Sequence, residues 1–241
     1  MTVWPKEPPV LSDDLLQKKA AWELYWLTEY PSKFSFVREF TVAFVRSGAP
    51  LANQTILEIG PGLQPVLGDV CELSGNYFAV ERSGVMAASL RGRFPRSHIV
   101  QGDIADGTNL PSAHFDRVIA AHVFEHIPDL PRALREIRRL LKPTGFLDVV
   151  LPCEGGLGYR LGRRFSSAKV FRAKFGSGFE EIIKSEHINT IFEIVDLLKT
   201  RFSVVETRLY PFNLWAAALA YHFNLLYAAR LRSVTGFEET V

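Results

Sequence analysis

One stretch of the chain constrains its fold more than any other. Residues 55–62 read Thr-Ile-Leu-Glu-Ile-Gly-Pro-Gly, an apolar run that leads directly into a glycine turn. The next apolar run, residues 77–80, ends at an acid, Glu81. Glycines let the backbone approach a ligand closely, and an acid after the following strand can bind the hydroxyls of a ribose. The pattern therefore predicts a site for an adenosine-containing cofactor at the carboxyl edge of a parallel sheet.

Composition favours one domain with additional segments. The chain has 241 residues, of which 47% are hydrophobic and 22% are charged, and its formal net charge of +2 gives no support for nucleic-acid binding. The six His and two Cys show no metal-ligand spacing, so no metal site is predicted. Cys71 and Cys153 are expected to be buried free thiols, which fits a reducing, cytoplasmic location. The N-terminus lacks the pattern of a signal peptide.

Short apolar strands alternate with helical segments along the middle of the chain. This alternation predicts right-handed βαβ units and a parallel sheet. A further helix at 190–200 and a strand at 202–209 follow later. The expected strands of the alternating part are 55–59, 77–80, 98–101, 115–120 and 145–151, and its expected helices are 64–74, 83–93 and 129–141.

Two segments lie outside the alternation. Helical periodicity at 13–29 and 34–46 predicts a pair of helices before the first strand. Residues 154–186 are rich in glycine, and the part from Arg160 to Lys174 carries six basic residues and no acid. Two interpretations of this basic stretch stay open. It is a solvated surface, or it is a lid that meets an anionic acceptor such as a phosphate, a nucleotide-linked sugar or a lipid head group.

The segment from Leu209 to Ala229 contains no charged residue. Its length is marginal for a membrane span, and its proline, histidine and asparagines argue against one. We expect a final core strand followed by a helix. The alternative is docking on a membrane surface, through aromatic residues of this segment. Those residues are Trp215, Tyr221, Phe223 and Tyr227.

Further motifs follow the strands in order. Gln-Gly-Asp-Ile at 101–104 follows the third strand, His-Val-Phe-Glu-His at 122–126 follows the fourth, and Leu-Lys-Pro-Thr-Gly begins at Leu141. With the glycine turn and Glu81, this series resembles the class I S-adenosylmethionine-dependent methyltransferases of the small-molecule type, over residues 56–152. A glycine turn alone is shared with dinucleotide dehydrogenases, whereas five motifs in order are specific.

The resemblance implies that S-adenosylmethionine is the cofactor. Glu81 would accept hydrogen bonds from both ribose hydroxyls, Asp103 would bind the adenine amino group, and Ile104 would pack on the ring. Gln64 departs from the family, which often has a third glycine there. It would donate to the cofactor carboxylate or cap a helix. The implied cofactor-binding residues are Glu58, Gly60, Pro61, Gly62, Gln64, Glu81, Arg82, Asp103, Ile104, Ala120 and His122.

Three histidines are the candidate catalytic bases: His122, His126 and His187. Methyl transfer depends mainly on positioning, and a base is needed only where the acceptor must lose a proton. A catalytic residue is therefore not required. Glu125 and His126 have the alternative role of bracing the loop, and the segment around His187 has that of capping a helix.

The resemblance also implies the fold and the organisation of the chain. The fold is α/β, a Rossmann-like, seven-stranded, mostly parallel sheet flanked by helices, with an antiparallel hairpin at the end that places strands near 202–209 and 213–221. The expected divisions are an N-terminal helical cover at 1–50, a cofactor-binding core at 51–152, a lid at 153–188, and a C-terminal helix with the last strands at 189–241.

The implied activity is methyl transfer to a small or carrier-linked acceptor. O-methylation of a sugar, glycolipid or related metabolite is favoured because the lid is basic. We expect no nucleic-acid partner, and we consider peripheral contact with the inner membrane surface. Two alternatives remain: a non-catalytic member of the fold that binds or scaffolds a partner, and a nicotinamide-dependent dehydrogenase.

Overall fold

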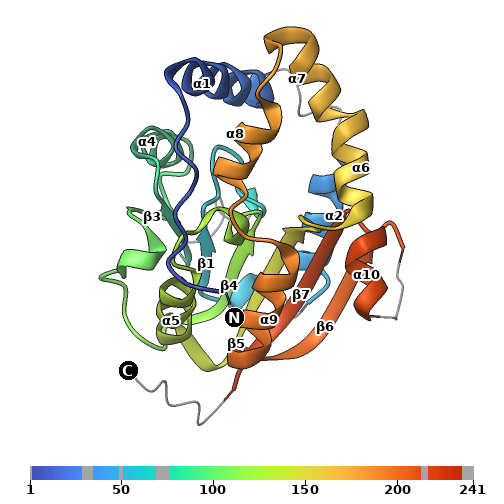
Figure 1. Cartoon of the computed structure of the whole chain (residues 1–241). Coiled ribbons are helices and arrows are strands. Elements are labelled where there is room, and N and C mark those ends of the chain that lie inside the picture. The colour runs from blue at the N-terminus through green and yellow to red at the C-terminus, as the bar shows by residue number, and fades with distance from the viewer. Residues whose placement is uncertain (1, 29–34, 49–50, 69–75, 213–216, 235–241) are drawn as a thin grey trace.

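The computed structural model describes residues 2–28, 35–48, 51–68, 76–212 and 217–234. A seven-stranded sheet lies at the centre, with helices on both of its faces and a further group of helices above one edge (Figure 1). The predicted α/β fold with a mostly parallel, seven-stranded sheet is therefore confirmed.

The strands follow the order β3-β2-β1-β4-β5-β7-β6 across the sheet. The first five in this order are parallel to their neighbours, whereas β7 runs antiparallel to both β5 and β6. The carboxyl ends of the parallel strands therefore meet at one edge of the sheet. The strands are β1 (Ile56–Ile59), β2 (Tyr77–Glu81), β3 (His98–Gln101), β4 (Phe115–Ala121), β5 (Leu141–Pro152), β6 (Phe202–Tyr210) and β7 (Leu226–Ser233).

Helices cover the two faces of the sheet because strand side chains alternate between two apolar clusters. One cluster joins the sheet to α5 (Leu130–Leu140) and α9 (Ile191–Arg201), and the other joins it to α2 (Ser35–Arg46) and α4 (Gly84–Arg93). The predicted helix starts are confirmed at two of these. The side chain of Asp129 caps α5 by accepting from the Arg132 N–H, and Ser83 caps α4.

A group of four helices, here called the helical cap, lies at the carboxyl edge of the strands (Figure 1). It consists of α1 (Asp13–Thr28), α6 (Leu157–Phe165), α7 (Ser167–Phe175) and α8 (Phe179–Glu186). Trp22 of α1 packs edge-on against Phe171 of α7 and Phe179 of α8, with ring centroids 5.4 and 5.9 Å apart. This third apolar cluster joins the N-terminal helix to the insert that follows β5.

The strand predicted near 213–221 is wrong. In the described part of that range, α10 (Ala217–Phe223) is helical, and the last strand is β7 at 226–233. The alanine run favours a helix, and Asn224 stabilises its end by donating to the Ala220 carbonyl 2.8 Å away. Of the helix predicted at 64–74, residues 69–74 lie outside the described residues, residues 64–67 are not helical, and residue 68 is helical.

The apolar segment from Leu209 to Ala229 completes the sheet instead of forming a separate unit. Its described parts belong to β6, α10 and β7, and Tyr227 is buried in the core. Within the described ranges, no helix combines the length and apolar character needed to cross a membrane. Tyr227 is therefore not available for the docking surface that the sequence suggested, and Trp215 lies outside the described residues.

A buried ionic network fixes α2 to the sheet. Asp148 of β5 is fully buried, and Arg230 of β7 donates to its two carboxylate oxygens at 2.8 and 3.1 Å. Arg117 of β4, also buried, places its Nε 3.7 Å from the same carboxylate. Both arginines donate to carbonyls of the last turn of α2, Arg230 to Phe44 at 3.2 Å and Arg117 to Val45 at 3.0 Å. The Phe44 carbonyl also accepts from the N–H and the hydroxyl of Ser47, at 3.1 and 2.7 Å, so the arginines add to the hydrogen bonds that end the helix.

Candidate functional site

The glycine turn after β1 has the backbone conformation that the sequence predicted. Gly60 and Gly62 have φ angles of 60° and 58°, which other residues rarely adopt. The Gly60 N–H donates to the Val80 carbonyl 2.8 Å away. A Cβ at Gly60 would lie 2.9 Å from Cγ2 of Val123, in the turn after β4. Because Gly60 has no side chain, the loops after β1 and β4 can lie close together at the carboxyl edge.

Glu81 closes this turn from the end of β2. Its buried carboxylate accepts from the Gly62 N–H at 3.0 Å and from the Ser83 N–H at 2.8 Å, so that each oxygen has one backbone donor. A carboxylate oxygen has capacity for a second hydrogen bond. Glu81 is thus a fixed anion with acceptor capacity left for a further donor.

Glu58 lies inside the protein and braces the segment after the glycine turn. Its carboxyl accepts from the Tyr77 hydroxyl at 2.6 Å and the Val66 N–H at 2.9 Å. Burial raises the pKa of Glu58 to about 7, although both hydrogen bonds act in the opposite direction. Its carboxyl is therefore engaged by the fold itself.

The remaining predicted cofactor residues differ in exposure. Asp103 is half-buried and accepts from the Ala105 N–H at 2.9 Å, which caps the short helix η3 (Ile104–Asp106). Ile104 is buried in the core cluster, so its side chain offers little surface to a ring. Gln64 and Arg82 are exposed, whereas Pro61 and Ala120 are buried.

His122 lies between β4 and the short helix η4 (Phe124–His126) with a positive φ of 57°. Its N–H donates to the Val150 carbonyl at 2.8 Å, and its Nε2 lies 3.4 Å from the Thr41 hydroxyl of α2. Burial lowers the pKa of His122 to about 4, and the nearby His187 adds to this effect. A strained residue with a shifted pKa at the end of a strand is typical of a functional site.

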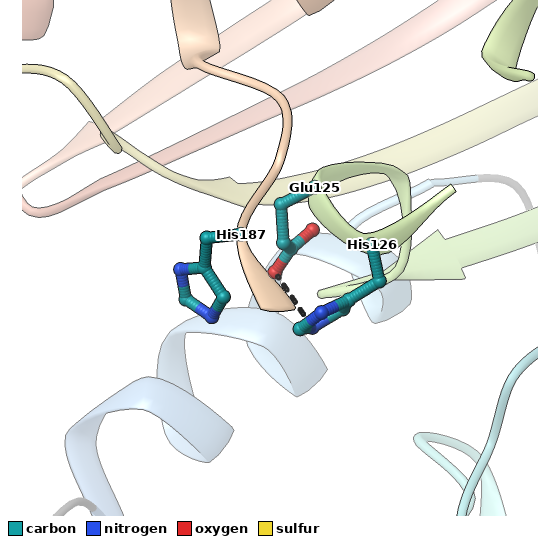
Figure 2. Close-up of side chains that lie close together, drawn as sticks. All are labelled: Glu125, His126 and His187. Carbon is teal, nitrogen blue, oxygen red and sulfur yellow. Dashed lines mark ion pairs between the residues drawn. The ribbon is translucent and has the colours of Figure 1, made fainter. Parts of the chain in front are cut away.

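Two further histidines and a glutamate meet next to His122. Figure 2 shows Glu125 and His126, from η4, beside His187, from the segment after α8. The Nε2 of His126 lies 3.8 Å from the Glu125 carboxylate, and the two imidazole centroids are 4.9 Å apart. Burial raises the pKa of Glu125 to about 7 and lowers that of His126 to about 3. The structure thus brings all three histidines proposed from the sequence to one place.

Comparison with known proteins identifies a family for the part of the chain that forms this edge of the sheet. Residues 57–149 match the family model described as "Methyltransferase domain". They include the glycine turn, Glu81 and the turn with Glu125 and His126.

Residues 57–149 are a class I S-adenosylmethionine-dependent methyltransferase domain.

A relative in Mycobacterium tuberculosis, named a probable S-adenosylmethionine-dependent methyltransferase, is 30% identical over 115 residues. The match covers 48% of this chain and 42% of that protein, so the chain spans less than half the length of this curated relative. Among solved structures, the plantazolicin methyltransferase in complex with SAH has a TM-score of 0.61 at 14% identity, over 92% of each chain. The [4+2]-cyclase SpnF has a TM-score of 0.56 at 16% identity, over 83% of this chain and 82% of its own. Likenesses at these identities show the fold alone.

The sequence interpretation missed two residues that position His187, namely Glu154 and Arg163. Nδ1 of His187 lies 2.9 Å from the carboxylate of Glu154, which Arg163 also binds at 2.6 Å. Burial lowers the pKa of His187, but the hydrogen bond to Glu154 and the nearby acids outweigh it, and the pKa rises overall. Glu154 follows directly after β5, so the rule that sites lie at strand ends gave a signal for it.

Arg163 does not act as the sequence suggested for the basic stretch. It is ion-paired with Glu154 and lies 3.4 Å from Glu180, so its guanidinium faces the protein. The exposed basic residues of the stretch are Arg160, Arg164, Lys169, Arg172 and Lys174. These five, and not Arg163, form the basic surface of α6 and α7.

Proposed function

We propose that the whole chain is a methyltransferase that uses S-adenosylmethionine. One observation carries the proposal: within the matched domain, the buried carboxylate of Glu81 accepts from the Gly62 N–H of the glycine turn and from the Ser83 N–H. When bound, S-adenosylmethionine supplies an electrophilic methyl group on a sulfonium. Glu81 would bind the ribose hydroxyls through charge-assisted hydrogen bonds, and Asp103 would bind the adenine.

The residues present fit this cofactor. Gly60 and Gly62 both have a positive φ that other residues rarely adopt, and a Cβ at Gly60 would collide with Val123 in the turn after β4. Glu81 needs no rearrangement to accept further donors. Gln64, in place of a third glycine, is exposed and so does not fill the turn. The fit supports a working site over a non-catalytic member of the fold.

The experiment that tests this proposal is calorimetric titration of the full chain with S-adenosylmethionine and its demethylated product. We expect one site with micromolar affinity for both. Titration with a nicotinamide dinucleotide should give no heat. Failure of both adenosyl ligands to bind the folded protein would instead favour a binding or scaffold role.

We further propose O-methylation of a lipid-linked sugar or a related glycolipid. The supporting observation is an apolar stripe on α6, formed by Leu157, Leu161 and Phe165, all at least half exposed and spaced four residues apart. Gly158, on another face of α6, packs against α10, where a Cβ would lie 3.0 Å from the His222 carbonyl. The stripe therefore faces away from α10.

Exposed basic residues lie on the same helix as this stripe and on the next helix. Arg160 and Arg164 lie on α6 itself, and α7 adds Lys169, Arg172 and Lys174. An apolar face flanked by basic residues is the pattern by which a helix lies on an anionic membrane surface. The α6 surface would then bring the site to a lipid-borne acceptor.

Vesicle binding tests the α6 surface. The protein should float with vesicles that contain phosphatidylglycerol and not with neutral phosphatidylcholine vesicles, and added salt should weaken the binding. Leu161→Asp with Phe165→Asp should reduce vesicle binding by about tenfold or more, because burial of each side chain contributes about 1.5–3 kcal/mol.

The control is Val85→Asp, which places an aspartate at an exposed apolar residue of α4 and is matched in charge to the single variant Leu161→Asp. It should bind vesicles as the unchanged protein does. Equal binding by the α6 double variant, or no binding by the unchanged protein, would rule out this membrane contact. It would leave the proposal of methyl transfer intact.

A further inference from the structure

Glu125, His126 and His187 place three metal-binding groups at one point of the carboxyl edge. A carboxylate oxygen of Glu125 and one nitrogen of each ring lie within 4.8 Å of one another. In Figure 2 the Glu125 carboxylate points between the two imidazole rings, with η4 on one side and the segment after α8 on the other. The helix η4 and the segment after α8, which are distant in sequence, thus place metal-binding groups at the same point.

Each imidazole is held with one nitrogen already engaged. Nδ1 of His126 lies 2.9 Å from the Glu186 carbonyl oxygen, and Nδ1 of His187 lies 2.9 Å from the Glu154 carboxylate. Both partners are acceptors, so each neutral ring carries its proton on Nδ1 and has a lone pair on Nε2. Metal-binding histidines are oriented in this way, by a carboxylate or a carbonyl behind the ring.

Glu125 gives independent evidence for a ligand. Its side chain is 2% exposed, and Oε2 has no hydrogen-bond partner among the described residues. A buried polar oxygen without a hydrogen-bond partner is costly, so such an atom in a folded protein calls for an explanation. A cation bound by the Glu125 carboxylate and the two imidazoles would supply the missing partner.

We propose that Glu125, His126 and His187 bind a divalent first-row transition-metal ion. Two imidazoles with one carboxylate suit Zn²⁺, Fe²⁺, Co²⁺ or Mn²⁺ better than Mg²⁺ or Ca²⁺, which prefer oxygen ligands. In a tetrahedral site, ligand atoms about 2.1 Å from the ion lie about 3.4 Å from one another. Side-chain rotations that move each ligand atom by about 1 Å would bring the three groups to this spacing. Three protein ligands leave at least one coordination position open.

The role of the ion rests on the proposed function. An acceptor hydroxyl at the open position has its pKa lowered, so its O–H bond breaks with the proton passing to water while the oxygen stays on the ion. The chain thereby activates an oxygen acceptor without a protein base. The metal site therefore selects hydroxyl acceptors.

Metal titration of the full chain tests the site without any assay of activity. After removal of metal by a chelator, Co²⁺ should bind at one equivalent and give visible absorption bands, and Zn²⁺ should displace it. His187→Ala and Glu125→Gln should each weaken Zn²⁺ binding by about 100-fold or more, since even partners behind the ligands contribute about 10–100-fold. The matched control is His98→Ala, at a histidine on β3, which should leave Zn²⁺ binding unchanged.

A second measurement needs no variant. X-ray absorption of the unchanged protein loaded with Zn²⁺ should show two imidazole ligands at about 2.0–2.1 Å and an oxygen ligand. No stoichiometric Zn²⁺ binding, a ligand set without two imidazoles, or equal affinity in correctly folded His187→Ala would overturn the proposal.

Calorimetry with S-adenosylmethionine separates this proposal from the proposed function. The metal-free protein should bind the cofactor with unchanged affinity, because Glu81, at the end of β2, and Asp103, at the cap of η3, are not among the proposed metal ligands. Loss of cofactor binding with metal binding intact would count against methyl transfer but not against the metal site. Loss of metal binding with cofactor binding intact would count against the metal site alone.

Discussion

Glu81→Ala should weaken the binding of S-adenosylmethionine by about 100-fold or more while the protein stays folded. The expected loss follows from two charge-assisted hydrogen bonds to the ribose, each contributing about 1.5–3 kcal/mol. The variant also frees the N–H groups of Gly62 and Ser83, which Glu81 now satisfies. This should lower the free energy of unfolding by about 1–3 kcal/mol, which a domain of typical stability tolerates.

Calorimetry measures the affinity, and circular dichroism with thermal unfolding checks the fold. The matched control is Asp106→Ala, at an exposed acid of η3 on the same edge of the sheet, which should leave the affinity within about twofold. An unchanged affinity in folded Glu81→Ala would remove the ribose role from this residue. A loss of similar size in Asp106→Ala would point to general electrostatics in place of a specific contact.

The position of Glu81, at the end of β2 and against the glycine turn, was predictable because its signals are local. A strand, a glycine turn and an acid at the end of the next strand are each encoded within a few residues. The parallel arrangement then fixes where they meet, because carboxyl ends of parallel strands share an edge. The strand positions at 77–81 and 98–101 and the cap at Asp129 were predictable for the same reason.

The C-terminal part was predicted less well because its apolar run has no period that separates helix from strand. Residues 213–221 were assigned to a strand, whereas the structure has α10 and then β7. The identity of the last strand depends on pairing with both β5 and β6, which no short window of sequence contains. Tertiary contacts decide such segments over local propensity.

The histidine cluster shows a different limit. Linear spacing gave no metal-ligand pattern, because His126 and His187 come from separate parts of the chain and only the return of the chain after α8 brings them together. Glu154, 33 residues before His187, orients that ring. The candidate residues could be proposed from the sequence, but their shared location and the tautomers they adopt could not.

The histidine cluster lies where the helical cap contacts the methyltransferase domain. Glu186 ends α8, and its carbonyl orients His126 of the methyltransferase domain. Arg163 of α6 binds Glu154, which orients His187. The insert therefore contributes to the geometry of the candidate site itself.

Asp148→Asn should lower the free energy of unfolding by about 3–5 kcal/mol. The substitution keeps the size of the side chain but leaves the buried guanidinium groups of Arg117 and Arg230 without their shared anion. For a chain of this size, the loss corresponds to a decrease in Tm of roughly 6–20 °C, measured by calorimetry or circular dichroism. The sequence did not suggest this role, because Arg230 reads as a charge that flanks an apolar segment.

The matched control is Asp14→Asn, at an exposed acid of α1 that pairs with Lys18 and should change stability by no more than about 0.5 kcal/mol. Because Arg117 and Arg230 hold the last turn of α2, Asp148→Asn should also loosen α2 and the contact between Thr41 and His122. Faster amide exchange confined to α2 would report this loosening. A stability change below about 1 kcal/mol, with α2 exchange unaltered, would show that the network does not anchor the helix.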